Sequence, residues 1–171
     1  MRLKNMCNIS RYRKIIGIIG GVILIGLIIK DRYDSKYSLT VTNYQLQSNF
    51  SSSLRILQLT DLHNSEFGAQ NSRLISDVRD QSPDLILLTG DMLNSNEQRT
   101  DIATNLITQL CDIAPVYCSN GNHEIEYQEN YGVDVDELYR EARAVVLEKE
   151  YQDIIVNDQK IRLGGIYGYC I

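Results

Sequence analysis

Histidine and proline are scarce in this chain, and its cysteines lack the spacing of a metal-binding ribbon. The 171 residues include two histidines, two prolines and four cysteines, with no CxxC pair among them. The scarcity of proline and the lack of any low-complexity tract argue against a disordered chain. The cysteine spacing excludes a zinc ribbon. The length accommodates an N-terminal segment and one domain of about 100–150 residues.

Charge is distributed unevenly along the chain. Residues 1–30 hold six basic side chains and no acidic one, whereas the rest hold eleven basic and 22 acidic side chains, a net charge of −11. An anionic domain repels phosphate backbones, so we expect no nucleic-acid partner, and a nuclease is disfavoured. A small phosphorylated substrate stays compatible with this charge, because bound divalent cations reverse the local sign.

An uncharged apolar run, Ile15–Ile29, lies between Lys14 and Lys30. We interpret residues 1–14 as a basic cytoplasmic tail and residues 15–30 as a transmembrane signal anchor, with the catalytic domain outside the cytoplasm. A helix of this length extends about 22 Å against a hydrocarbon core of about 30 Å, and the flanking lysines lengthen its reach by snorkelling. A cleaved signal peptide is the alternative, but no small-residue cleavage site follows. A buried core helix is disfavoured because the run has no polar face.

Residues 31–53 are expected to form a linker and a first strand, and residues 54–171 an α/β domain. Apolar runs, helical spacing and breakers such as Pro83 predict the elements. Alternating strands and helices at this spacing predict right-handed crossovers and a mostly parallel sheet. We interpret Cys118 as a small buried residue, and a disulfide with Cys111 is left open. The expected strands are Ser38–Gln47, Leu54–Thr60, Leu85–Thr89, Val116–Ser119, Asp153–Val156 and Lys160–Leu163, and the expected helices are Asn71–Gln81, Asp101–Cys111 and Asp134–Ala144.

A polar cluster follows each of three buried strands. The clusters are Asp61-Leu62-His63, Gly90-Asp91 and Gly121-Asn122-His123-Glu124, and they contain both histidines of the chain. In an open α/β sheet, ligands bind beyond the carboxyl ends of the strands, so these side chains are expected to converge. Carboxylates, imidazoles and amide oxygens are ligands for divalent metals. The clusters therefore predict a metal site.

The spacing within the clusters suggests how the ligands share two ions. Asp61 and His63 are two residues apart, so on an extended backbone both side chains point the same way and suit one ion. Asp91, next to a glycine that permits close backbone approach, is placed to bridge two ions. Asn122 offers an amide oxygen to the second ion, and His123 is placed to meet the substrate.

Each cluster also has an ordinary structural explanation. An Asp-x-His pair arises often by chance, a Gly-Asp pair after a strand is commonly a turn, and GNHE can be a capping turn. The occurrence of all three in this order, each after a buried strand, favours the metal site. Three neighbouring polar residues are expected to be solvated loop groups or supporting groups, namely Asn64, Glu66 and Glu126.

The series DLH, GD and GNHE resembles the calcineurin-like metallophosphoesterase superfamily. The strings LTDLHNSEFG, PDLILLTGD and PVYCSNGNHE resemble its bacterial membrane-anchored branch, from about Tyr44 to the end of the chain. The resemblance implies a four-layer αββα sandwich, of which this chain holds the N-terminal half. It also implies a centre of two divalent metal ions (manganese, iron or zinc) and phosphoester hydrolysis, in which a metal-bound hydroxide attacks phosphorus.

The resemblance implies a role for each matching residue. Asp61 and His63 would bind the first metal, Asp91 would bridge both metals, and Asn122 would bind the second. His123 would not be a ligand but would hydrogen-bond the phosphate and assist the leaving oxygen.

Two features depart from the family pattern. Family members carry further histidines downstream, including a GHxH motif, whereas this chain has none after His123, so the second metal site is incomplete. We therefore interpret the chain as a C-terminally incomplete form with weak or no activity. Asn94 stands where many members place a carboxylate beside the GNH histidine. An amide can hydrogen-bond the imidazole but stabilises its protonated form less.

The leading hypothesis is a membrane-anchored hydrolase that acts on a phosphorylated small-molecule or lipid-linked substrate. The alternative is a non-catalytic, membrane-tethered relic or interaction domain that keeps the first half of the site. The number of bound metal ions, together with phosphatase turnover, separates the two hypotheses.

Overall fold

The computed structural model describes residues 16–31, 38–48 and 52–166, and the chain divides into two compact units, Met1–Thr42 and Asn43–Ile171. In the first unit, residues 16–31 form a helix with exposed side chains. At 1.5 Å per residue this helix extends about 24 Å, short of a hydrocarbon core of about 30 Å. No helix within the described ranges is long and apolar enough to cross a membrane. The expected transmembrane anchor over residues 15–30 is therefore not supported.

The strand expected over Ser38–Gln47 is wrong. Residues 38–48 have no regular secondary structure, and the side chains of Tyr44 and Leu46 are 86% and 88% exposed. A strand needs a neighbour to accept and donate its backbone hydrogen bonds, and no described strand pairs with this segment. Alternating residue types alone did not make a strand here.

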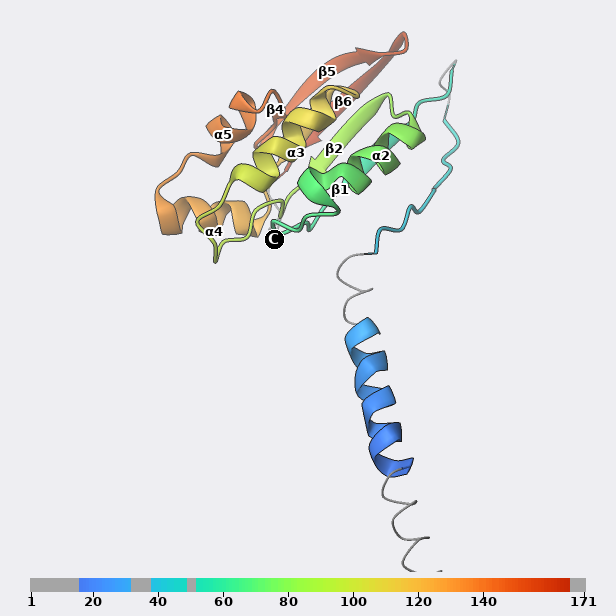
Figure 1. The fold of residues 1–171 in the computed structure, drawn as a ribbon. Helices are drawn as coiled ribbons and strands as arrows, with labels where there is room; N and C mark the ends of the chain where they lie inside the picture. The colour runs from blue at the N-terminus through green and yellow to red at the C-terminus, as the bar shows by residue number, and fades with distance from the viewer. Residues whose placement is uncertain (1–15, 32–37, 49–51, 167–171) are drawn as a thin grey trace, which may run out of the picture. The chain divides into compact units, whose positions relative to one another are not determined.

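The second unit is built on a four-stranded parallel sheet in the order β1-β2-β3-β4 (Figure 1). The sheet confirms the expected parallel arrangement. Leu59 pairs with Leu88, and Thr89 pairs with Ser119, so β1, β2 and β3 end nearly level at one edge. The polar clusters that follow these strands therefore begin side by side. The strands are β1 (Ile56–Leu59), β2 (Leu85–Thr89), β3 (Val116–Ser119) and β4 (Val145–Val146).

Two helices with apolar faces pack beside each other. These are α2 (Ser72–Gln81), which follows the 3-10 turn η1 (Ala69–Asn71), and α3 (Asp101–Cys111). α3 contacts α2, β3 and α5 (Val135–Glu141). Burying a leucine or isoleucine side chain contributes about 1.5–3 kcal/mol, so these faces hold the helices in place. The buried apolar residues are Leu74, Ile75 and Val78 of α2, Ile102, Leu106, Ile107 and Leu110 of α3, and Leu85, Ile86 and Leu88 of β2.

Two further helices follow β3. The first, α4 (Asn122–Tyr131), lies where no helix was expected. The second, α5 (Val135–Glu141), is shorter than the expected Asp134–Ala144. Asp134 caps it by accepting a hydrogen bond from the Glu137 N–H at 3.0 Å, and Arg143, with φ of 76°, turns the chain into β4.

The chain then forms an antiparallel hairpin of β5 (Glu150–Val156) and β6 (Gln159–Gly165). Both turn residues, Asn157 and Asp158, have positive φ, which suits the right-handed twist of a two-residue hairpin. The hairpin confirms both expected strands and extends them. Cys111 and Cys118 are free thiols, and Cys118 is buried as expected. The α/β class is confirmed, whereas the four-layer sandwich stays a prediction.

Candidate metal centre

The ends of β2 and β3 approach each other through two glycines. A Cβ atom on Gly90 would lie 2.6 Å from the backbone nitrogen of Gly121. A Cβ on Gly121 would lie 2.7 Å from the backbone nitrogen of Asp91 and collide with its carboxylate. Gly90 also has φ of +93°, which L side chains rarely adopt. Glycine at both positions lets Asp91 lie directly against the start of α4.

The loop after β1 runs beside the loop after β2. The Asp61 N–H donates to the Gly90 carbonyl at 3.2 Å, and the His63 N–H donates to the Asp91 carbonyl at 2.9 Å. The Asn64 N–H donates to the Met92 carbonyl at 2.9 Å. These bonds continue the pairing of the two strands beyond their ends. They hold Asp61 and His63 beside Asp91.

The backbone at the three residues is left-handed. Asp61, His63 and Asp91 have φ of 57°, 47° and 56°. The extended backbone expected between Asp61 and His63 is therefore wrong, although their side chains do lie together. Non-glycine residues in sparsely populated backbone regions cost of order 1–3 kcal/mol each and are concentrated at functional sites. Three such residues at one point mark this loop pair as a functional region.

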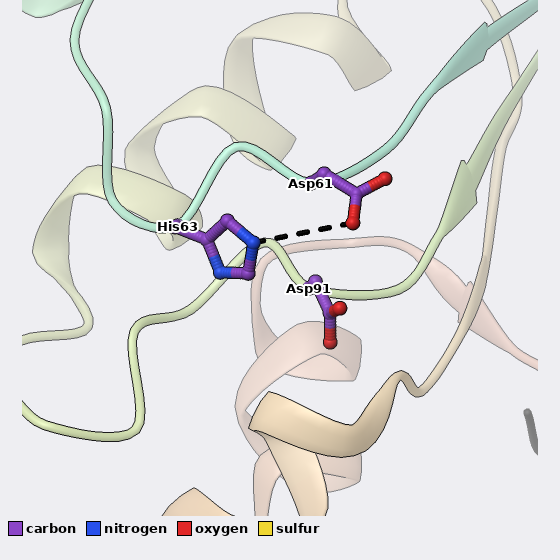
Figure 2. A group of neighbouring side chains, drawn as sticks. All are labelled: Asp61, His63 and Asp91. Atoms are coloured by element: carbon purple, nitrogen blue, oxygen red, sulfur yellow. Dashed lines mark ion pairs between the residues drawn. The ribbon is translucent and has the colours of Figure 1, made fainter.

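The three side chains converge, as Figure 2 shows. Asp61, His63 and Asp91 each offer one ligand atom, and these atoms lie within 4.8 Å of one another. The Nε2 atom of His63 lies 3.9 Å from Oδ1 of Asp61, whose side chain is 62% exposed. Ligands about 2.1 Å from a common ion lie at most about 4.2 Å apart, so only a small movement of the side chains is needed to bring all three around one ion. Two carboxylates and an imidazole fit a divalent metal.

His63 also has a ring nitrogen without a partner. Its Nδ1 atom is buried and has no hydrogen-bond partner in the described part of the chain. Buried polar atoms are seldom left in this state in stable structures. Nε2, on the other side of the ring, faces the Asp61 carboxylate and is the ring nitrogen placed to bind a cation.

Asn122, the first residue of α4, lines the same pocket as Asp61 and Asp91. The pocket has a volume of ≈ 480 Å³. Pockets of about 300–1,000 Å³ accommodate small ligands. Oδ1 of Asp91 accepts a hydrogen bond from the His123 N–H at 3.0 Å, which ties this carboxylate to the first turn of α4. The ligand roles of these residues stay predictions.

His123 lies beside His63 and is held by Ser95. The two imidazole rings meet edge to face, with centroids 4.4 Å apart. Nδ1 of His123 lies 3.0 Å from the Ser95 hydroxyl. The expected partner, Asn94, instead accepts from the Asn96 N–H and donates to Glu97. The structure therefore corrects the partner of His123 from Asn94 to Ser95, because the side chain of Asn94 forms its hydrogen bonds within the turn after β2.

Glu124 supports the structure of the site. The sequence places it in the third polar cluster but indicates no role for it. Its side chain is fully buried. The carboxylate accepts five hydrogen bonds, which offset the cost of burying a charge. The donors are the backbone N–H groups of Asp91 at 2.7 Å, Met92 at 2.8 Å, Leu93 at 3.0 Å and Gly121 at 2.9 Å, and the hydroxyl of Tyr139 at 3.0 Å.

These bonds make Glu124 a clamp between the loop after β2 and the start of α4. Burial, and then the neighbouring Glu124 carboxylate, raise the pKa of Tyr139 well above its ordinary value, so its hydroxyl stays a donor. One sequence signal could have revealed the clamp: Glu124 stands three residues after Gly121, at the position from which a glutamate reaches back to the N-cap.

A parallel α/β sheet with carboxylates and an imidazole gathered beyond its strand ends defines a metal-dependent class of protein. The model of the calcineurin-like phosphoesterase family matches residues 54–169. The chain therefore belongs to the calcineurin-like phosphoesterase family. No curated protein sequence matches the chain.

Proposed function

We propose that this chain is a metal-dependent phosphoester hydrolase with two divalent metal ions (manganese, iron or zinc) beyond the ends of β1, β2 and β3. The observation that carries the proposal is the convergence of Asp61, His63 and Asp91 within a chain of this family. Asp61 and His63 would hold the first ion, Asp91 would serve both ions, and Asn122 would help to hold the second.

Bound divalent cations would supply positive charge to the phosphate and would lower the pKa of a water molecule toward about 7. The chain's own residues position the substrate. His123 lies at the edge of the ligand cluster, beside His63. Its role is to hydrogen-bond the phosphate and give a proton to the leaving oxygen. The clamp at Glu124 keeps Asp91 and the start of α4 in register during this step.

The substrate is proposed to be a phosphorylated small molecule or lipid-linked phosphoester. Support comes from the pocket of ≈ 480 Å³. The acidic composition supports the proposal that nucleic acid is not a partner. Action outside the cytoplasm, the bacterial branch of the family, the αββα sandwich and the incompleteness of the chain stay predictions.

The alternative function, a non-catalytic interaction domain, has one observation in its favour. Among the described residues, only Asp61, His63 and Asp91 form a cluster of three metal-ligating acidic or histidine side chains. A single weakly held ion would match that reading.

Hydrolysis by the purified full chain with added manganese tests the proposal. In line with the weak activity expected from the sequence, we expect slow turnover of 4-nitrophenyl phosphate or bis(4-nitrophenyl) phosphate, which Asp91→Asn should lower to the uncatalysed rate. Asp80→Asn, an exposed change on α2, is the matched control and should leave turnover unchanged. Hydrolysis that is equal in all three proteins, or absent from the wild-type chain, contradicts the proposal.

A further inference from the structure

Ser95 is enclosed by three side chains from one face of α4. His123, Glu126 and Asn130 follow one another at i, i+3 and i+7, the spacing that places side chains on the same face of a helix. Ser95 is 2% exposed, and its carbonyl accepts a hydrogen bond from Nδ2 of Asn130 at 3.2 Å. The other two side chains meet the Ser95 hydroxyl. The turn after β2 is thereby fastened to α4 at the position of His123.

The Ser95 hydroxyl has one partner that can act only as a hydrogen-bond acceptor, the carboxylate of Glu126. Oγ of Ser95 donates to Oε2 of Glu126 at 2.8 Å, and a carboxylate has no proton to return. The hydroxyl oxygen then presents a lone pair to Nδ1 of His123, 3.0 Å away. A lone pair facing a ring nitrogen is favourable only where that nitrogen carries a proton. The chain of bonds therefore runs from Nδ1–H to Oγ and from Oγ–H to the carboxylate.

A second contact at Nδ1 favours the opposite arrangement. The backbone N–H of Ser95 points at the same nitrogen from 3.3 Å, and this contact needs a bare Nδ1. The hydroxyl contact is shorter and ends on a charge, and charge-assisted hydrogen bonds are about twice as strong as neutral ones. The hydroxyl contact therefore decides the tautomer. Nε2 of His123 has no hydrogen-bond partner in the part of the chain that the structure describes, so it is the ring nitrogen available to contact a substrate.

We propose that Ser95 and Glu126 are positioning residues for His123: their relay keeps a proton on Nδ1, fixes the ring, and presents Nε2 to the substrate. The task of Nε2 rests on the proposed function, whereas the relay itself does not. In metal and catalytic sites, the bond made by one imidazole nitrogen sets the state of the other. Glu126, exposed and three residues beyond His123, supplies the charge that the amide of Asn94 does not.

Nitrogen-15 NMR of the full chain, without added metal, tests the relay directly. At about pH 9, well above the ordinary imidazole pKa of about 6.5, the proton-bearing and bare ring nitrogens have well-separated shifts. With only two histidines in the chain, His63→Asn identifies the His123 signals. We expect wild-type His123 to carry its proton on Nδ1. A bare Nδ1 in the wild-type protein would overturn the proposal.

Substitutions at Ser95 and Glu126 distinguish the two contacts to Nδ1 of His123, one from the Ser95 hydroxyl and one from the Ser95 backbone N–H. In Ser95→Ala only the backbone N–H of position 95 remains, so the proton should move to Nε2. Glu126→Gln keeps an acceptor but loses the charge, so the tautomer population should shift part of the way. This side chain is exposed, so the variant should fold even if Ser95→Ala does not. Glu129→Gln, on an exposed side chain of the same helix, is the matched control and should match wild type. Identical spectra for Glu126→Gln and Glu129→Gln would contradict the relay.

Kinetics with two leaving groups adds a readout that a purely structural role would not move. If Nε2 takes up a second proton and gives it to the leaving oxygen, the ring returns to the form that carries its proton on Nδ1, and the positioning of Nε2 matters most for a poor leaving group. We expect Glu126→Gln to lower kcat about tenfold on phenyl phosphate and less than about threefold on 4-nitrophenyl phosphate, with KM unchanged. An equal loss on both substrates contradicts the positioning role. If the wild-type chain has no turnover, the proposed function fails, while the NMR comparison still decides the relay.

Discussion

The carboxylate of Glu124 accepts a hydrogen bond from the backbone N–H of Asp91 at 2.7 Å, across 33 residues of sequence. The bond joins the only fully buried carboxylate that the structure describes to a predicted metal ligand. Four further donors complete the contacts of Glu124. This clamp, rather than the strands alone, places the loop after β2 against α4.

Replacing Glu124 with glutamine should destabilise the fold. The amide NH2 of the new side chain would face backbone N–H donors that now meet a carboxylate oxygen, and each unsatisfied buried donor costs about 1–3 kcal/mol. We expect the free energy of unfolding in urea to fall by about 3–5 kcal/mol for Glu124→Gln. Glu129→Gln should stay within about 0.5 kcal/mol of wild type. A loss below about 1 kcal/mol for Glu124→Gln would show that the clamp does not hold the fold.

Adding a methyl group at Gly121 should weaken metal binding. The Cβ would stand 2.7 Å from the backbone nitrogen of Asp91, so Asp91 must move away from its partners. Isothermal titration with manganese should show at least about tenfold weaker binding for Gly121→Ala, because a displaced ligand no longer reaches a bond of about 2.1 Å. A matched change at Gly20, where a Cβ meets nothing within 4 Å, should leave the affinity unchanged. Equal affinities for the two variants would contradict the close approach of β2 and β3.

The side chain of Asn94 should have little influence on His123, even though its neighbour Ser95 holds the ring. Its amide bonds lie within the turn, to Asn96 and Glu97. Asn94→Ala should therefore leave the nitrogen-15 shifts of His123 and kcat within about twofold of wild type, as for surface changes in general. Shifts in Asn94→Ala as large as those in Ser95→Ala would restore Asn94 as the partner.

The hairpin of β5 and β6 should lose an ion pair at low pH. The Arg162 guanidinium binds the Asp153 carboxylate through two hydrogen bonds and lowers its pKa from 3.8 to about 2. Because the folded pKa lies below the unfolded one, this contribution to stability is complete above about pH 4. It is lost as pH falls toward about 2.

An NMR titration of the Asp153 carboxyl tests this ion pair. The pKa should rise toward about 3.9 in Arg162→Gln, with a residual lowering from Lys160, and should not change in Arg140→Gln. A low pKa that survives in Arg162→Gln would assign its cause to another group.

Elements with strong local signals could be predicted from the sequence. The bounds of β2, α3 and β3 match because apolar runs or a helical stripe stand between clear breakers. α4 could not be predicted, because it buries only Glu124 and Tyr127 and so lacks an apolar stripe. The segment Ser38–Gln47 shows the opposite error, since it has an alternating pattern but no partner strand.

The candidate metal site likewise has features that the sequence predicts and features that it does not. The convergence of Asp61, His63 and Asp91 follows from the rule that parallel strands end at one edge, so the sequence sufficed. Their left-handed backbone could not be foreseen, because it results from hydrogen bonds between two loops whose bonded residues lie 28 or 29 positions apart. The relay through Ser95 and Glu126 was equally hidden, because an exposed glutamate on a helix gives no sequence signal of its partner.

Anomalous X-ray diffraction from crystals of the full chain grown with manganese shows whether Asp61, His63 and Asp91 bind a common ion. We expect a peak about 2.0–2.3 Å from carboxylate oxygens of Asp61 and Asp91 and from Nε2 of His63. An occupied manganese site elsewhere on the chain, with no peak among these three side chains, would contradict this expectation.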